Sequence, residues 1–260
     1  MPKPRLSIII PSRAQPRQTE FLARAVRSIQ GQSIIDRYEV TVWVGVDAGQ
    51  HPDAATVQRL GLRVAESTGR SQAAALNAVI RQVDADLVAF LEDDDEWMPT
   101  YLETMAQALA VGAFVSSTQL EVDEQDVIVR INDFPTPSGW FMPFSTLQAV
   151  GPFNEDYRFH LDHEWLGRLG ETGLPRAHLV EATAPCDGRY VAAIRPWLDN
   201  VVRFSGGRVQ LGRHGSPYPL VRRRVHGQSG MGQIAQQPAL RDVSVAEMQR
   251  LAARFGRVPW

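Results

Sequence analysis

The stretch "DLVAFLEDDDEWMPTYLE" (residues 86–103) places a strand, an acidic loop and a helix in direct succession. Residues 87–91 are all apolar, as in strands that are buried on both faces of a parallel sheet. Five acids at residues 92–96 follow the strand directly. Pro99 stands where we expect the first turn of the next helix, a position that tolerates proline. The stretch therefore predicts one β–loop–α unit with concentrated negative charge at its turn.

The same alternation of strand and helix fills the chain before residue 86. Thr19 is the expected N-cap of the first helix, and Gly31 its expected end. Alternating strands and helices imply right-handed βαβ crossovers and a mostly parallel sheet, which is the α/β fold class. We expect strands at 6–10, 38–46, 62–67 and 86–91, and helices at 19–32, 53–60, 71–83 and 99–110.

The pattern becomes less regular after about residue 111, where we place a boundary between two halves that do not fold independently. Residues 114–122 and 126–133 predict two strands of a hairpin, and residues 205–219 predict a loop. Helical patterns occupy residues 145–151, 163–173, 192–204 and 243–256.

Composition and charge exclude several classes of protein. The net charge of -2 over 260 residues argues against a general nucleic-acid binder. Cys186 is the single cysteine, which excludes an intramolecular disulfide framework and fits a reducing compartment. The apolar run at residues 6–10 is too short for a signal peptide, and no segment reaches the roughly 18 apolar residues of a transmembrane helix. We expect a cytoplasmic protein. A location at the membrane periphery and assembly into a homo-oligomer stay open as alternatives.

The acids at residues 92–96 need an explanation, because neighbouring carboxylates repel one another. They could charge the N-terminus of the following helix, where negative charge is favourable, but one or two acids would be enough. Five acids favour a bound cation, and hard oxygen ligands prefer magnesium or manganese. Ligands of open α/β sheets bind beyond the carboxyl ends of the strands, which also draws attention to residues 11–13 and 47–49.

Several segments in a fixed order carry a resemblance to a known family. They are "LSIIIPSR" (6–13), "VWVGVDAGQ" (42–50), "QAAALNAVI" (72–80), "LVAFLEDDDEWMPTYLE" (87–103), "VGPFNEDYRFHLDHEWLGRL" (150–169) and "RRRVHGQS" (222–229). Together they resemble the family 2 glycosyltransferases, which have the GT-A fold. The resemblance runs from Leu6 to Ser229.

For the donor, the resemblance implies that Pro11, Ser12 and Arg13 lie where the first loop meets the nucleotide. Asp47 stands where the family reads the base or the ribose, and Asp93 would hold the ribose or the sugar.

For the metal and the chemistry, the resemblance implies further roles. Residues 92–94 cover the family's D-x-D element, with Asp94 as the first metal ligand and Glu92 where the family often has Asp. His226 matches a histidine that approaches the metal or the diphosphate in some members. Asp162 falls on the catalytic base.

The resemblance implies a GT-A-type, Rossmann-like, mostly parallel sheet flanked by helices, with an acceptor-side second half and a helical C-terminal tail. Residues 1–111 would be the nucleotide-sugar-binding half, residues 112–230 the acceptor-binding and catalytic half of the same domain, and residues 231–260 the tail with a helix.

The implied activity is that of an enzyme, a metal-dependent, inverting glycosyltransferase of the hexosyltransferase type, using Mn²⁺ or Mg²⁺. It would move a sugar from a nucleoside diphosphate sugar to the hydroxyl of an unidentified acceptor. A UDP-sugar is the first choice of donor, with GDP- and TDP-sugars as alternatives. Ala48 replaces an acid of the family's "D-D-G-S" that can accept the imide N–H of uracil, which weakens the case for uridine.

Alternatives remain at each site. The protein could be a sugar nucleotidyltransferase, although residues 8–16 lack the expected glycine-rich loop, or a non-catalytic relic that binds a nucleotide sugar. Asp47 could simply cap a turn, and His226 could be structural. Asp162 could be a helix N-cap, or part of a zinc cluster with His160, His163 and Glu164, although the spacing fits no standard zinc site. The arginines at 222–224 could form a solvated face or meet phosphate.

Overall fold

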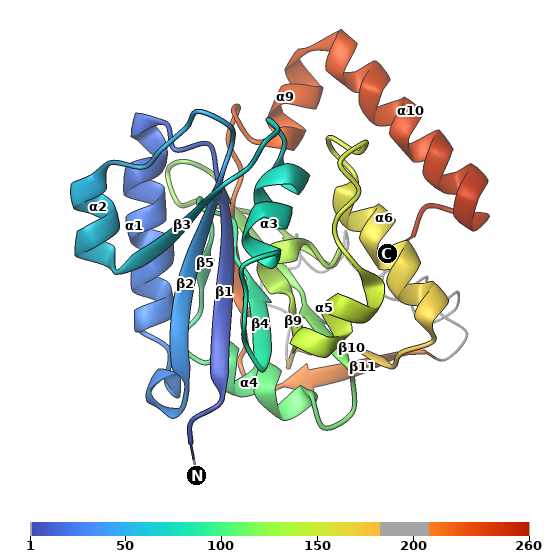
Figure 1. Cartoon of the computed structure of the whole chain (residues 1–260). Helices are drawn as coiled ribbons and strands as arrows, with labels where there is room; N and C mark the ends of the chain where they lie inside the picture. The colour runs from blue at the N-terminus through green and yellow to red at the C-terminus, as the bar shows by residue number, and fades with distance from the viewer. Residues whose placement is uncertain (1, 183–207, 260) are drawn as a thin grey trace.

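The computed structural model describes residues 2–182 and 208–259, and a large β-sheet forms the centre of this part of the chain (Figure 1). Eight described strands build the sheet in the order β11-β10-β6-β9-β4-β1-β2-β3. Neighbouring strands are parallel, except that β9 lies antiparallel between β4 and β6. The strands are β1 (Arg5–Ser12), β2 (Glu39–Val46), β3 (Leu62–Glu66), β4 (Leu87–Phe90), β6 (Phe114–Ser117), β9 (Phe141–Pro143), β10 (Arg176–Glu181) and β11 (Val209–His214).

Helices pack on both faces of the large sheet, and β1 shows how the sequence specifies this. Leu6, Ile8 and Ile10 pack with α1 and α4, whereas Ile9 packs on the opposite face with α3, α5 and α6. Successive side chains of a strand point to opposite faces, so a strand buried on both faces needs a continuous apolar run. The helices are α1 (Pro16–Gln30), α2 (Ala54–Leu60), α3 (Gln72–Ile80), α4 (Tyr101–Ala108), α5 (Phe144–Val150) and α6 (Leu161–Thr172).

Strand β2 and helix α3 approach each other closely at Gly45. A Cβ atom at this position would lie 2.2 Å from the carbonyl oxygen of Ala75, so no side chain fits. The glycine therefore sets the distance between the strand and α3, whose first residue, Gln72, reaches the acidic loop.

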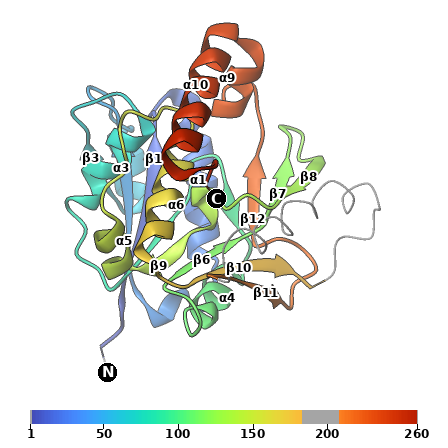
Figure 2. The ribbon, with the colours of Figure 1, turned by 90° about the vertical axis from the view of Figure 1, so that its right-hand side faces the viewer.

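A second sheet of four described strands, in the order β5-β12-β7-β8, lies beside the large sheet (Figure 2). The chain leaves the large sheet at Ser117 and enters the small sheet at Gln119, with Thr118 between them. The small sheet comprises β5 (Glu96–Trp97), β7 (Gln119–Val122), β8 (Ile128–Asn132) and β12 (Val221–Arg224). Because β5 directly follows the acidic loop, the small sheet fixes the C-terminal end of that loop.

The C-terminal part of the chain forms α9 (Gly230–Gln236) and α10 (Pro238–Phe255), and α10 lies along α6 (Figures 1 and 2). Leu251 of α10 is fully buried in the core cluster that contains α6. The ring of Phe255 covers Gly167, where an added Cβ would meet it at 2.6 Å. None of the described helices is both long and apolar enough to cross a membrane.

The predicted α/β fold class is confirmed, with its mostly parallel sheet and flanking helices. The predicted hairpin is also present, since β7 and β8 pair antiparallel. The predicted single strand at 114–122, however, is two strands in two different sheets. The predicted loop at 205–219 contains β11, which pairs with the buried strand β10.

Four predicted helix starts were wrong by two residues or more. Helix α6 begins at Leu161 and α10 at Pro238, before the starts predicted at residues 163 and 243. Helix α1 begins at Pro16, three residues before Thr19, and its N-cap is Gln15. This earlier start agrees with the preference for proline in the first turn of a helix. Helix α4 has its N-cap at Thr100, so Pro99 precedes the helix. The helix predicted at 192–204 and Cys186 lie outside the described residues.

Candidate active site

Three loops meet at the carboxyl end of the large sheet, after the neighbouring strands β4, β1 and β2. Ser12, at the end of β1, donates from Oγ to Asp93 Oδ2 at 2.6 Å, which joins the first loop to the acidic loop. Burial raises the pKa of both Asp47 and Asp93, and the charge of Arg13 acts against this at both carboxylates. Arg13, which directly follows Pro11 and Ser12 in the sequence, is thus close enough for its charge to act on carboxylates of both loops.

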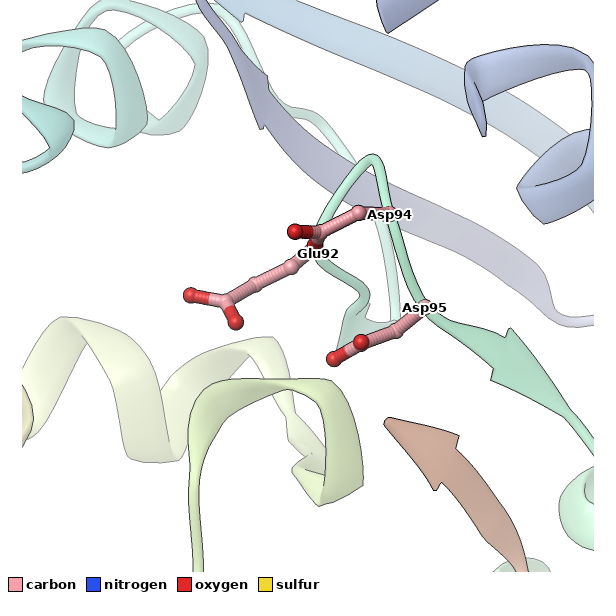
Figure 3. A group of neighbouring side chains, drawn as sticks. All are labelled: Glu92, Asp94 and Asp95. Atoms are coloured by element: carbon pink, nitrogen blue, oxygen red, sulfur yellow. The ribbon is translucent and has the colours of Figure 1, made fainter. Parts of the chain in front are cut away.

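The acidic loop is a tight turn between β4 and β5, closed by a hydrogen bond of 3.1 Å from the backbone N–H of Asp95 to the carbonyl of Glu92. Glu92, Asp94 and Asp95 each offer a carboxylate oxygen, and these atoms lie within 4.8 Å of one another. Figure 3 shows the three carboxylates directed to the same side of the turn. Like charges this close repel one another and gain from a shared cation.

Neutral side chains orient two of these carboxylates. Gln72 Nε2 donates to Glu92 Oε1, and His226 Nε2 donates to Asp94 Oδ2, both at 2.8 Å. The backbone N–H of Gln228 donates to His226 Nδ1 at 3.2 Å, so the ring proton is on Nε2. The structure thus brings His226 to the acidic loop, in contact with Asp94.

Asp95 differs from its neighbours, because both of its oxygens are engaged by the protein. Oδ1 accepts from the backbone N–H of Arg224 at 2.9 Å, and Oδ2 accepts from Ser138 Oγ at 2.5 Å. The residue is only 1% exposed, and burial raises the pKa of its carboxyl well above the ordinary value. Asp95 therefore fixes the acidic loop to β12, and its oxygens are less available to a cation than those of Glu92 and Asp94.

Part of the negative charge is balanced by arginines of the small sheet. Burial alone would lower the pKa of Arg223, but Glu92, Asp95 and the buried Glu121 raise it above its ordinary value. Arg223 forms an ion pair of 2.8 Å with Glu121. Arg224 lies 3.6 Å from Glu96. The arginines at 222–224 are thus not simply a solvated face, because each pairs with an acid of the same protein, and a role near phosphate stays a prediction.

Asp162 lies in the first turn of α6, and its charge contributes to the raised pKa of Glu92 across the site. The N-cap of this helix is His160, so the alternative in which Asp162 is the N-cap is wrong. Asp162 Oδ1 accepts from the backbone N–H of His163 at 2.8 Å. No donor among the described residues binds its other oxygen.

The alternative zinc cluster around Asp162 does not form. His160 Nε2 contacts Ser244 Oγ at 2.8 Å, and His163 Nδ1 contacts the carbonyl of Pro259 at 2.5 Å. Glu164 is 1% exposed and paired with Arg168 through both of its oxygens. The acidic loop supplies the group of potential metal ligands found in the described part of the chain.

Sequence patterns did not point to several residues that build this site. Gln72 and Ser138 orient acids of the loop from distant segments, and Arg223 supplies a partly buried countercharge. Arg70 acts on the carboxyl of Asp47 alongside Arg13. Gln72 and Arg223 lie in segments already singled out in the sequence, but no local signal identifies their contacts, and none points to Ser138 or Arg70.

Comparisons with known proteins agree with this geometry. The sequence profile described as "Glycosyl transferase family 2" matches residues 7–163, which is more than half of the chain. This segment contains the three loops and Asp162. No curated protein sequence matches the chain.

Two solved structures share the fold. The mannosyltransferase PcManGT from Pyrobaculum calidifontis, solved with GDP-Man and Mn²⁺, is 19% identical and aligns with a TM-score of 0.52 over 72% of this chain and 59% of its own. S. aureus TarS 1-349, solved with UDP, is 11% identical and aligns with a TM-score of 0.54 over 86% of this chain and 61% of its own. The chain thus spans less than two thirds of either protein, and identities this low show the fold alone.

Proposed function

The chain belongs to glycosyl transferase family 2, and from this premise we propose that it transfers a sugar from a nucleoside diphosphate sugar to an acceptor hydroxyl with inversion at the anomeric carbon. The observation that carries the proposal is the hydrogen bond that joins Ser12 to Asp93 of the acidic loop, together with the electrostatic effect of Asp162 on Glu92 of the same loop. Donor, cation and base would then share one site.

The acidic loop fits a hard divalent cation such as Mn²⁺ or Mg²⁺. Its carboxylate oxygens lie close together, and Gln72 and His226 orient Glu92 and Asp94. Asp94 and Glu92 would be the protein ligands, with His226 beside Asp94. When bound, such an ion would neutralise the charge that develops on the departing diphosphate.

The loops after β1 and β2 would hold the nucleotide. Asp93 would bind the ribose or the sugar while Ser12 fixes its orientation, and Asp47 would contact the base or ribose. Arg13 and Arg70 flank Asp47 and add positive charge near the phosphates. The related structures contain GDP-Man and UDP, which supports UDP- and GDP-sugars as donors for this chain, with a TDP-sugar as the remaining alternative.

Asp162 would act as the general base. Its carboxylate would take the proton from the acceptor hydroxyl as that oxygen forms a bond to the anomeric carbon. The bond between the anomeric carbon and the diphosphate breaks at the same time, and the nucleoside diphosphate leaves with the electron pair. The free oxygen of Asp162 is suited to this role, because its other oxygen is already held by the backbone N–H of His163.

In this proposal residues 1–111 bind the donor and residues 112–230 supply the base and the acceptor surface. The large sheet runs through both parts, since β9 pairs with β4 and with β6. The two halves would therefore act as one rigid frame around the reacting groups.

Release of nucleoside diphosphate from a panel of UDP-, GDP- and TDP-sugars tests the proposal, with Mn²⁺ or with a chelator. Even without an acceptor, slow hydrolysis of one donor should appear with Mn²⁺ and disappear with the chelator. A second reaction with nucleoside triphosphate and sugar phosphate should give no pyrophosphate. Pyrophosphate formation would assign the protein to the nucleotidyltransferases, and the absence of both activities would contradict the proposal.

A further inference from the structure

Glu247 of the C-terminal helix α10 binds the chain just before α6. Its carboxylate accepts from the backbone N–H groups of Arg158 at 2.6 Å, Phe159 at 2.9 Å and His160 at 3.0 Å. Glu247 is only 1% exposed. The residue lies outside the segment 7–163 that the family profile matches.

A carboxylate that is buried in this way is costly unless it is well paired. Three N–H donors supply that pairing, and hydrogen bonds to an ionised acceptor are stronger than neutral ones. Two of the donors precede α6 and the third is its N-cap, where the helix dipole also favours negative charge. Glu247 therefore holds the backbone of residues 158–160 in one conformation.

Two further contacts hold the same part of the chain. Ser244, one turn before Glu247 on α10, contacts His160 Nε2 through Oγ at 2.8 Å. The carbonyl of Pro259 contacts His163 Nδ1 at 2.5 Å. The C-terminal segment thus binds on both sides of Asp162 in the sequence.

Asp162 itself has little to fix its direction. Among the described residues, the hydrogen-bond donor to its carboxylate is the backbone N–H of the next residue, His163. The position of the carboxylate thus follows from the backbone at the start of α6, and not from another side chain. A backbone shift of about 1 Å near reacting groups can cost about a hundredfold in rate.

We propose that Glu247 is a positioning residue, which aligns Asp162 by clamping the backbone of residues 158–160. The inference rests on the proposed function, in which Asp162 is the base. It gives the C-terminal helix a part in turnover, although α10 contributes no group to the donor site.

The test is the variant Glu247→Gln, which keeps the size of the side chain but places an NH₂ donor against backbone N–H donors. We expect kcat for Mn²⁺-dependent turnover of the nucleotide sugar to fall by about tenfold or more, while calorimetric affinity for the nucleoside diphosphate stays within about twofold. The matched control is Glu171→Gln, which removes an exposed ion pair of 3.2 Å between α6 and α10 and should leave kcat unchanged.

A double variant asks whether Glu247 acts through Asp162. If it does, adding Glu247→Gln to Asp162→Asn should lower kcat by no more than about twofold beyond Asp162→Asn alone. If the two losses multiply, the positioning inference is wrong. Should Glu247→Gln fold poorly, Ser244→Ala removes only the hydroxyl at His160 and should give a smaller loss of kcat in the same direction.

Hydrogen exchange gives a readout that needs no activity. The amides of residues 158–160 should be protected in the wild type and exchange faster in Glu247→Gln, with the rest of α6 unchanged. This inference is overturned if the exchange of residues 158–160 is unchanged in Glu247→Gln, or if Asp162→Asn loses turnover and Glu247→Gln does not. Neither result affects the proposed function. Unchanged turnover in Asp162→Asn instead overturns the base assignment, and exchange then still decides whether Glu247 clamps the segment.

Discussion

The substitution Asp162→Asn should remove the proposed base while it leaves the folded structure intact. The carbonyl oxygen of Asn can still accept the backbone N–H of His163, which Asp162 Oδ1 binds at 2.8 Å. The change removes one favourable charge from the first turn of α6, worth about 0.3–1 kcal/mol, and also relieves repulsion with Glu92. We therefore expect the free energy of unfolding to change by less than about 1 kcal/mol.

The effect on turnover should be much larger. Asn cannot take the proton of the attacking hydroxyl, and a positioned base contributes about a hundredfold to ten-thousandfold. The lower limit corresponds to about 2.7 kcal/mol of transition-state stabilisation. Since the proposed donor contacts lie on the loops after β1, β2 and β4, affinity for the nucleoside diphosphate should stay close to that of the wild type.

The assay measures nucleoside diphosphate release from the best donor of the panel, with calorimetry and thermal melting of the same samples. Turnover within about threefold of the wild type, with intact folding, would remove Asp162 from the mechanism. Glu164 could not replace it, because that side chain is 1% exposed and bound by Arg168. Glu155, which accepts from Asn77 at 2.9 Å, would become the next candidate.

Three further predictions concern the donor site and the stability of the fold. Asp94→Ala should abolish most Mn²⁺-dependent binding of nucleoside diphosphate. The control Asp84→Ala, at an exposed acid on the opposite end of the sheet, should not affect this binding. Equal calorimetric affinity of the wild type with and without chelator would contradict the metal site. Ala48 cannot accept an imide hydrogen bond, so uridine diphosphate should be preferred over guanosine and thymidine diphosphates by less than about a thousandfold, or roughly 4 kcal/mol. A larger preference in competition binding would mean that another residue reads the base. Burial lowers the pKa of His178 from 6.5 to about 4, so the unfolded state binds its proton first as the pH falls. In urea unfolding, the free energy of unfolding of the wild type should therefore fall by about 2–3 kcal/mol more than that of His178→Gln between pH 7 and pH 4.5. Equal losses would contradict the interpretation that His178 is buried and neutral.

The first half of the fold could be predicted because its signals are local. A continuous apolar run such as residues 6–10 marks a strand buried on both faces, and the real β1 buries these residues with Ile8, Ile9 and Ile10 at 0% exposure. The helix predicted at 53–60 is present as α2, with Asp53 accepting from the N–H of Thr56 at its N-cap.

The second half was harder because its elements depend on distant partners. Residues 114–122 are one apolar-rich run, and nothing in it shows that the strand changes sheets at Thr118. Strand β11 lies in a segment rich in glycine and forms because β10 offers a parallel edge. Local propensity is a weak guide where a strand exists mainly through its neighbours.

The candidate site shows the same division. The acids after β4 stood out in the sequence, because five adjacent charges are unusual at the end of a buried strand. The resemblance already pointed to His226 near the metal, whereas the contact of Ser138 with Asp95 could not be predicted, since Ser138 lies far along the chain. Arg223 lies among the arginines already noted in the sequence, but its pairing with Glu121 could not be predicted, because that contact requires the small sheet.

The pairing of β5 with β12 also fixes when the site can form during synthesis. Trp97 lies opposite Val221, so 124 residues (221 − 97) separate the two partners. At roughly 5–20 residues per second, the ribosome adds the second partner about 6–25 s after the first. During this interval the acidic loop is complete in sequence but lacks Arg223, Arg224 and His226. A nascent chain that stalls before residue 221 would therefore lack these three partners of the acidic loop, and we expect donor binding only in chains long enough to include β12.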